Sequence, residues 1–397
     1  MKEEIDAYKG CKLILFINIF YITISYLYAL IRKEYNGDFL DIPVNLNPFF
    51  LSFVWIISII PFLGLWLLYK KYKKKHIPYK KVYISIGFVK MFVFILLISH
   101  IFVTLVFGVG KAGFSVYQAP SFIKFFIQIL LRFDSTMWGV FLIFICSKKD
   151  YTTLLWTILL LSILGITRAS MGFLFFTFWI TIIKYNKELL HFLKKYFFII
   201  CIIIPTFPFF VEFAYNQRDI LRKAGDGNIK YDKNTLLAGK LVGRLSSFSN
   251  TAILIDKGIY YYIIAQDFDT FFYQKNMLIM INGSVFSKKD VPEKVLIENG
   301  PENASFMLGT SGILIFSLYK STTSFFINLF SIIIICILVF KILKTINFSM
   351  NNEYAFFILL GPVLSGVGLE YFACLLNAII LFITLLFFRA FKKLQLN

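Results

Sequence analysis

The chain contains a succession of apolar runs, each about as long as a membrane crossing. A helix needs about 20 apolar residues to cross a hydrocarbon core about 30 Å thick. Lipid offers no hydrogen-bond partner to an unpaired backbone group, so such runs are expected to be helical. The sequence therefore predicts an all-α polytopic membrane protein with about ten transmembrane helices. The runs cover residues 11–31, 48–69, 82–107, 120–146, 151–167, 169–184, 196–214, 322–344, 353–368 and 371–389.

The composition excludes a soluble globular chain. Of the 397 residues, 58% are hydrophobic and only 16% are charged, whereas a soluble domain has about 25% charged residues. Acidic residues flank the first lysine and no small-residue cleavage site follows the first apolar run, so we expect that run to stay as an anchor. The segment 306–319 is short and interrupted by glycine, and is either an eleventh span or a re-entrant segment.

Basic residues in the short loops predict the orientation, because cytoplasmic loops carry an excess of lysine and arginine. Residues 69–81 contain seven lysines and no acidic residue, so this loop is expected to be cytoplasmic. An even number of spans then places the remaining basic loop ends inside as well. This favours ten crossings, with both termini in the cytoplasm. Those basic ends are Lys148, Lys149, Lys184, Lys187, Lys194, Lys195, Arg389, Lys392 and Lys393.

The expected organisation has three parts. Residues 1–214 form an N-terminal membrane bundle of seven spans, residues 215–305 form one large extracytoplasmic helical loop, and residues 306–397 form a C-terminal bundle of three to four spans. The net charge of +19 is spread along the membrane-proximal ends, which favours contact with anionic lipids rather than with nucleic acid. The five cysteines all lie in or beside apolar runs, so no disulfide framework is expected.

Charged residues at membrane depth are the strongest pointers to function in such a chain, because each costs several kcal/mol unless it is paired or hydrated. Arg132 and Asp134 lie about midway along the fourth run. Two residues apart on a helix, they are expected to point to different faces and to need separate partners or a hydrated cavity. The alternatives are a structural ion pair between helices, or an interfacial helix that ends near Asp134.

Two further charged residues lie at expected outer turns. Arg168 follows the fifth run among small residues, which leave its guanidinium uncovered. It is either a functional cation or an interfacial arginine that reaches the lipid headgroups. Glu370 lies between the last two runs and is either a site residue or an ordinary surface carboxylate.

Two basic pairs in the large loop are spaced four residues apart, Arg218 with Arg222 and Lys240 with Arg244. Like charges at this spacing repel on a helix, so a bound anion would account for them, and arginine matches phosphate through a planar fork. Alternatively, Arg222 pairs with Asp226 on a solvated face and Lys240 is merely exposed.

The loop lacks the residues of several other chemistries. The three histidines are His76, His100 and His191, and none of them lies in the large loop. The outer face therefore offers no histidine base and no ligand cluster, so we expect no metal and no cofactor. No nucleotide-binding glycine pattern is present either.

Together these features resemble an O-antigen polymerase, the bacterial enzyme that joins oligosaccharide repeat units in lipopolysaccharide or capsule assembly. The resemblance lies in the number of spans, the single large late loop and three local motifs. The motifs are residues 167–172 (TRASMG), 243–250 (GRLSSFSN) and 309–316 (GTSGILIF).

The resemblance implies a GT-C-like glycosyltransferase in the bacterial inner membrane. Its donor and acceptor would be glycans linked to undecaprenyl pyrophosphate, and a chain-length regulator protein is an implied partner. Arg168 and Arg244 match the family's arginines best, and Arg132 and Asp134 are the further catalytic candidates. The substrate-binding candidates are Arg218, Arg222, Lys240, Asp219 and Glu370, and the general base is Asp134, Asp219 or Glu370.

Three other functions remain open. The related O-antigen ligase shares the architecture but is expected to use an outer-loop histidine. A lipid-linked-oligosaccharide flippase would have basic residues in its core spans without needing a large loop. A membrane acyltransferase would need a histidine at the membrane face, for which His100 is the remaining candidate.

Overall fold

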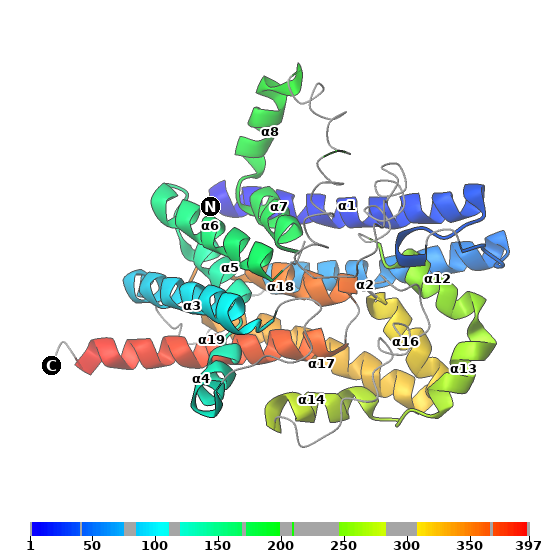
Figure 1. The fold of residues 1–397 in the computed structure, drawn as a ribbon. Coiled ribbons are helices and arrows are strands. Elements are labelled where there is room, and N and C mark those ends of the chain that lie inside the picture. Colours follow the sequence, from blue (N-terminus) through cyan, green and yellow to red (C-terminus); the bar gives the residue numbers. More distant parts are fainter. Residues whose placement is uncertain are drawn as a thin grey trace.

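The computed structural model describes residues 2–39, 42–74, 85–110, 120–168, 172–198, 209, 246–282, 308–365 and 368–394. Over these residues the chain is helical, and the only β-type pairing is a single bridge between Glu34 and Pro43. The long helices run roughly side by side in Figure 1. The all-α prediction is therefore confirmed for the described part of the chain.

In the described part of the chain, five helices are long and apolar enough to cross a membrane. They are α1 (Lys2–Arg32), α2 (Pro48–Lys74), α3 (Ile86–Phe107), α17 (Thr322–Thr345) and α19 (Gly368–Leu394). A sixth crossing is formed if α4 (Ser121–Leu131) and α5 (Ser135–Ile145), which meet at a bend, count as one broken span.

The other predicted spans are shorter in the structure or fall outside it. α6 (Tyr151–Thr167), α7 (Gly172–Lys184) and α18 (Asn351–Ser365) have 17, 13 and 15 residues, fewer than the roughly 20 of an upright crossing. Most of segment 196–214 lies outside the described residues, after α8 (Asn186–Lys195). The described residues thus contain five to six helical segments that could cross a membrane, and ten crossings remain a prediction.

The two uncertain regions of the sequence pack into the bundle. Segment 306–319 overlaps α16 (Gly309–Lys320), whose 12 residues span about 18 Å, too little for an upright crossing. The described part of the large loop forms α12 (Phe248–Asp256), α13 (Gly258–Gln266) and α14 (Phe272–Asn282). α12 is almost wholly buried and joins the main hydrophobic core against α1, α2 and α16. A short 3₁₀ turn (Gly37–Phe39) lies beside it.

Two prolines inside helices are compensated by hydrogen bonds from neighbouring helices. Proline has no N–H, so the carbonyl four residues earlier loses its partner. Pro61 in α2 leaves the carbonyl of Ile57, which accepts a hydrogen bond of 2.6 Å from the hydroxyl of Ser311 in α16.

The same device recurs in α18. Pro362 leaves the carbonyl of Ile358, and the thiol of Cys374 in α19 donates to it at 3.3 Å. Both helices are thus tied to a partner at the point where the proline interrupts their own hydrogen bonding.

Ion pairs join the helices at the end of the bundle where α1 begins. Lys187 of α8 pairs with Asp6 of α1, and Lys148 pairs with Glu188. The described parts of the lysine-rich segments therefore lie at one end of the bundle, as the orientation argument requires. Two further pairs between described residues lie at this end: Lys73–Glu353 joins α2 to α18, and Lys90–Asp150 joins α3 to the start of α6.

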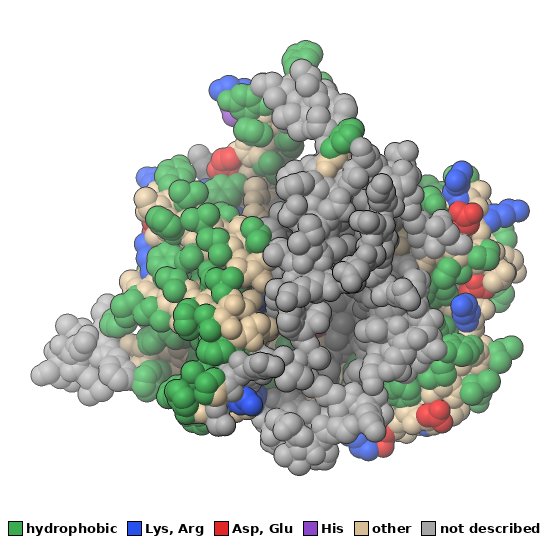
Figure 2. Space-filling model, in the orientation of Figure 1, with side chains coloured by type: hydrophobic (Ala, Val, Ile, Leu, Met, Phe, Trp, Pro, Cys, Tyr) green, Lys and Arg blue, Asp and Glu red, His purple; other side chains and the backbone are tan. Residues whose placement is uncertain are grey.

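Hydrophobic side chains cover much of the outer surface over α3 and α6 in Figure 2. Phe102 and Leu105 of α3 are 58% and 66% exposed, and Leu155 of α6 is 68% exposed. A soluble protein rarely exposes a contiguous apolar surface of this kind. The surface is what a lipid-facing helix bundle requires.

We predict that the close approach of α1 to α7 depends on Gly10. A Cβ atom at this position would lie 2.4 Å from the Ile182 carbonyl oxygen and 2.6 Å from the Ile183 Cα, and backbone atoms cannot rotate away. Gly10→Ala should lower the unfolding free energy by about 1–3 kcal/mol, as overpacking does, measured by thermal unfolding in detergent. Gly87→Ala is the control, because nothing lies within 4 Å of its added Cβ. Equal stability of the two variants would contradict the described packing.

We also predict the orientation of the bundle from its charge asymmetry. Alkaline phosphatase fused after Lys74, at the lysine-rich end of α2, should be inactive because the enzyme folds only outside the cytoplasm. The same reporter fused after Lys257, between α12 and α13, should be active. Equal phosphatase activity at the two positions would place Lys74 and Lys257 on the same side of the membrane and contradict the predicted topology.

Candidate functional site

The predicted fourth span is broken at the position of its charged residues. α4 ends at Leu131 and α5 begins at Ser135, and the two helices are bent by 42°. The expectation that Arg132 and Asp134 occupy different faces of one continuous helix is therefore wrong. A break inside an apolar bundle exposes backbone groups that need partners.

Polar side chains supply those partners. Asp134 is the N-cap of α5, and its carboxylate accepts hydrogen bonds from the backbone N–H groups of Thr136 (2.9 Å) and Met137 (3.1 Å). On the other side of the break, His100 Nε2 lies 3.2 Å from the Leu130 carbonyl oxygen near the end of α4. The charge of Asp134 thus stabilises the start of α5, where the helix dipole favours an anion.

The same histidine holds Arg168. The guanidinium NH2 of Arg168 lies 2.9 Å from His100 Nδ1. Because arginine only donates, Nδ1 must accept, and the proton sits on Nε2, where it is donated to the Leu130 carbonyl. Both ring nitrogens of the neutral imidazole are therefore engaged.

A glycine turn covers the other side of this guanidinium. Gly110 follows the end of α3 with φ +73°, and a Cβ there would lie 3.3 Å from Arg168 Nε. Nε is buried and has no hydrogen-bond partner among the described residues. Burial lowers the pKa of Arg168 below its usual value, and the carboxylate of Asp134 offsets part of this shift. The guanidinium stays charged. Glycine is needed here both for its left-handed backbone and for the close contact.

These residues line one cavity of about 640 Å³. Its wall comes from the end of α3, the break between α4 and α5, the residue after α6, and the facing parts of α18 and α19. The structure thus brings together four residues that the sequence had singled out separately. They are Arg132, Asp134, Arg168 and Glu370.

The charged residues of the cavity lie at helix ends. Both carboxylates lie at helix N-termini: Asp134 caps α5, and Glu370 is in the first turn of α19. Helix N-termini carry partial positive charge and stabilise carboxylates. The two guanidiniums lie at helix C-termini, since Arg132 follows α4 and Arg168 follows α6. Helix C-termini carry partial negative charge, which stabilises cations. All four groups are thus supported in their charged form, and the two arginines are the groups beside which an anion would bind.

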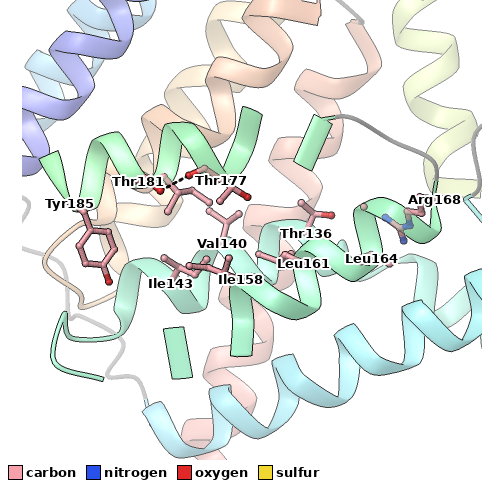
Figure 3. Close-up of a pocket in the computed structure, with 12 residues that line it drawn as sticks. Thr136, Val140, Ile143, Ile158, Leu161, Leu164, Arg168, Thr177, Thr181 and Tyr185 are labelled. Atoms are coloured by element: carbon pink, nitrogen blue, oxygen red, sulfur yellow. Dashed lines mark hydrogen bonds between the residues drawn. The ribbon is translucent and has the colours of Figure 1, made fainter. Parts of the chain in front are cut away.

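A second, smaller cavity of about 90 Å³ lies between α5, α6 and α7. Figure 3 shows Thr136 and Arg168 toward one end of it and Tyr185 at the other. Arg168 and Thr136 line both cavities. The Thr181 hydroxyl in its wall donates to the Thr177 carbonyl of its own helix at 2.8 Å.

The five loop candidates fall outside the described residues: Arg218, Asp219, Arg222, Lys240 and Arg244. The described end of the 243–250 motif is buried: the Ser246 hydroxyl donates to that of Ser25 at 2.6 Å. In the 309–316 motif, Gly309 packs on Ser247, and the Thr310 hydroxyl lies 2.6 Å from that of Tyr371. These parts of the two motifs serve packing rather than the cavity.

The sequence argument named His100 only as the candidate base of an acyltransferase, and it did not name Asn377. His100 is the only histidine inside an apolar run, and a polar ring at membrane depth is costly unless it is paired, which is the signal that it shares with Arg132. Asn377 accepts a hydrogen bond of 3.4 Å from the Asp134 backbone N–H. With Glu370 and Cys374 it repeats at positions i, i+4 and i+7 of α19, a polar stripe that the sequence displays.

No group of three or more potential metal ligands is found among the described residues. Metal-independent chemistry remains a prediction.

We predict that His100 stabilises the site through both ring nitrogens. His100→Leu removes the acceptor for Arg168 and the donor to Leu130, and should lower the unfolding free energy by about 1–3 kcal/mol, the usual cost of an unsatisfied buried group. His100→Gln retains one donor and one acceptor and should lose clearly less. Chemical unfolding in detergent compares the two variants, and an equal loss would contradict this arrangement.

Comparison of the chain with protein-family models, with curated proteins and with solved structures finds no match in any of the three. Any functional assignment therefore rests on the residues and the geometry described above.

Proposed function

We propose that this chain is a membrane glycosyltransferase that joins lipid-linked oligosaccharide repeat units, with undecaprenyl pyrophosphate as the leaving group. The proposal includes a GT-C-like arrangement of about ten spans in the bacterial inner membrane, with both termini cytoplasmic. It also places the reaction at the extracytoplasmic face, with a chain-length regulator as a partner.

The observation that carries the proposal is the cavity lined by Arg132, Arg168, Asp134 and Glu370. Its charged residues come from the ends of α4, α5, α6 and α19 that lie away from the lysine-rich segments. With those segments in the cytoplasm, the cavity lies toward the outer face. Broken spans that border a polar cavity are also recurring components of substrate sites inside membrane proteins.

The reaction would proceed by direct displacement. The hydroxyl oxygen of the acceptor glycan bonds to the reducing-end carbon of the donor glycan, and the bond from that carbon to the pyrophosphate oxygen breaks. Arg168 and Arg132 would stabilise the negative charge that develops on the pyrophosphate. No nucleophile on the protein is needed, in keeping with a cavity of guanidinium and carboxylate groups.

The hydroxyl proton needs an acceptor, and Glu370 is the better of the two carboxylates in the cavity. Asp134 already accepts two backbone hydrogen bonds as the cap of α5, so protonating it would weaken the start of that helix. Glu370 lies across the cavity on α19. Asp219 lies outside the described residues and stays a further candidate.

The state of His100 favours this function over two of its competitors. A ligase or an acyltransferase of the expected kind would use a histidine as a base. Here Nδ1 faces a guanidinium donor and Nε2 faces a backbone carbonyl, so the ring positions Arg168 rather than accepting a proton. A flippase would also have basic residues in its core spans, so the cavity does not distinguish a flippase from a polymerase. The experiment below distinguishes the two.

Deletion of the gene, with gel display of the surface glycan, separates these functions. Loss of a polymerase leaves one repeat unit on the lipid core, loss of a flippase leaves none, and loss of an acyltransferase leaves full-length chains. Full-length chains in the deletion strain would contradict the proposal.

We predict that Arg168 acts through its planar fork and not only through its charge. Lysine presents a single compact charge, so Arg168→Lys is not a conservative change at a bidentate site. Removing one contact to the leaving group costs about 2–4 kcal/mol, or roughly a 30- to 1,000-fold lower rate. In the complemented deletion strain, Arg168→Lys and Arg168→Ala should both reduce long chains to single or few repeats at normal protein level.

The matched control is Lys257→Ala, an exposed cation between α12 and α13, which should leave chain length unchanged. Arg132→Leu should resemble Arg168→Ala. Wild-type chain length in Arg168→Lys would show that charge alone suffices, and Arg244 would become the better candidate for the pyrophosphate clamp.

A further inference from the structure

Two ion pairs fix the start of α8 at the lysine-rich end of the bundle. Lys187, in its first turn, pairs with Asp6 of α1 at 3.2 Å, and the candidate membrane span of α1 begins at Asp6. The next residue, Glu188, pairs at 2.7 Å with Lys148, which lies between the end of α5 and the start of α6. The start of α8 therefore lies at the boundary between the apolar bundle and water.

From this point α8 does not continue along the bundle. In Figure 1 it leaves near the start of α1 and extends across the direction of the long helices. Its 10 residues span about 15 Å at 1.5 Å per residue. Because the helix runs crosswise, it stays close to the level at which it starts. This is the placement of a helix that lies in the plane of a membrane surface.

The side chains of α8 form a basic face and an apolar face. The basic residues recur at i, i+4, i+7 and i+8, the spacing of one helix face, and Figure 2 shows lysine and histidine side chains together on one side of α8. The basic residues are Lys187, His191, Lys194 and Lys195. The apolar residues of the opposite face are Leu189, Leu190, Phe192, Leu193 and Tyr196.

The apolar face is largely uncovered by the protein. Leu190, Phe192 and Leu193 are 47%, 53% and 40% exposed, and Phe197 and Phe198, directly after α8, are 58% and 82% exposed. In water these side chains would forfeit the free energy of apolar burial. At the boundary of a bundle whose helices expose apolar side chains to lipid, the same lipid reaches them without a further partner.

The basic face keeps charge that the protein does not neutralise. Lys187 and Glu188 are both paired, whereas Lys194 and Lys195 form no ion pair with any described residue. These two lysines lie at the end of α8 that is farther from the bundle. Uncompensated positive charge at this level meets the headgroup layer of a membrane, where anionic lipids attract it.

A hollow of about 460 Å³ lies where the two faces of α8 meet. It is lined by Lys187, Glu188, His191, Phe192, Lys195 and Tyr196. The rings of Phe192 and Tyr196 lie 4.8 Å apart, and Lys195 Nζ lies 5.3 Å from the centre of the Tyr196 ring. Cations beside aromatic rings suit a group that is anionic at one end and apolar at the other.

We propose that α8 lies in the membrane surface, with its apolar face among the lipid chains and its lysines bound to the headgroups of anionic lipids. An acidic protein partner would match the lysines but would leave the apolar face, on the other side of the helix, uncovered. A bilayer surface offers hydrocarbon chains to one face and anionic phosphates to the other.

The first test measures the depth of both faces in the full chain, reconstituted in vesicles of phosphatidylcholine and phosphatidylglycerol. A nitroxide label is attached to the apolar face in Leu193→Cys and to the basic face in His191→Cys, and the labelled wild-type chain gives the background. Oxygen, which concentrates among lipid chains, should relax the label of Leu193→Cys more than a water-soluble nickel chelate does. The order should be reversed in His191→Cys.

Two results of this measurement overturn the proposal. Stronger relaxation by the nickel chelate in both variants would place α8 in water. Protection of Leu193→Cys from both reagents would show that protein covers the apolar face.

The second test measures the charge dependence at α8 itself. A phosphatidylglycerol with a photoactivatable group near its headgroup should label α8 peptides of the reconstituted chain, and a phosphatidylcholine analogue should label them clearly less. Each lysine near an anionic surface changes the local amount of lipid roughly fivefold. Lys194→Gln/Lys195→Gln should therefore reduce the labelling of α8 by about 5- to 25-fold, relative to the labelling of α3.

The matched control is Lys71→Gln/Lys74→Gln, which removes the same charge from exposed positions in the last turn of α2 at the same end of the bundle. It should leave the labelling of α8 unchanged. An equal decrease in the two double variants would show general charge attraction and overturn the proposal, as would equal labelling by the two lipids. Neither test involves the proposed reaction.

Discussion

The structure depends on the requirement that every backbone polar group inside an apolar bundle finds a partner within the protein. The continuous helices satisfy it by themselves, and the interrupted ones do not. Ser311 and Cys374 donate to the carbonyls freed by the two helix prolines. Lys184, buried between helices, donates to the carbonyls of Ile143 and Cys146 at the end of α5. Each of these hydrogen bonds also joins two helices, so the interruptions in the helices contribute to the tertiary packing.

The same requirement explains why the candidate site is where it is. The break between α4 and α5 frees backbone groups on both sides, and Asp134 and His100 satisfy some of them. Because the side chains of His100 and Arg168 are hydrogen-bonded to each other, Arg168 also lies at the break. A polar cavity then forms where helix continuity fails, and residues that serve stability and residues available for chemistry are in direct contact. Variants here need a stability measurement beside an activity measurement.

The sequence predicted the long helices well because length and hydropathy suffice to identify a membrane crossing. It did not predict the break, since Arg132 and Asp134 in an apolar run fit a continuous helix with separate partners as well as an interrupted one. Asn377, which bonds to Asp134, lies 243 residues away in the chain, and no local pattern brings the two together. The role of α16 was hidden for the same reason: Ser311 matters only because Pro61 lies opposite it.

The preorganisation of Arg168 supports the proposed function. A free arginine side chain loses much rotamer freedom when it binds an anion, and this loss weakens transition-state stabilisation. Here His100 fixes one face of the guanidinium and Gly110 covers Nε, so much of the ordering is completed when the protein folds. Electrostatic stabilisation is largest when its groups need no reorganisation during the reaction. A merely interfacial arginine would gain nothing from such support, because it needs only to reach the headgroups.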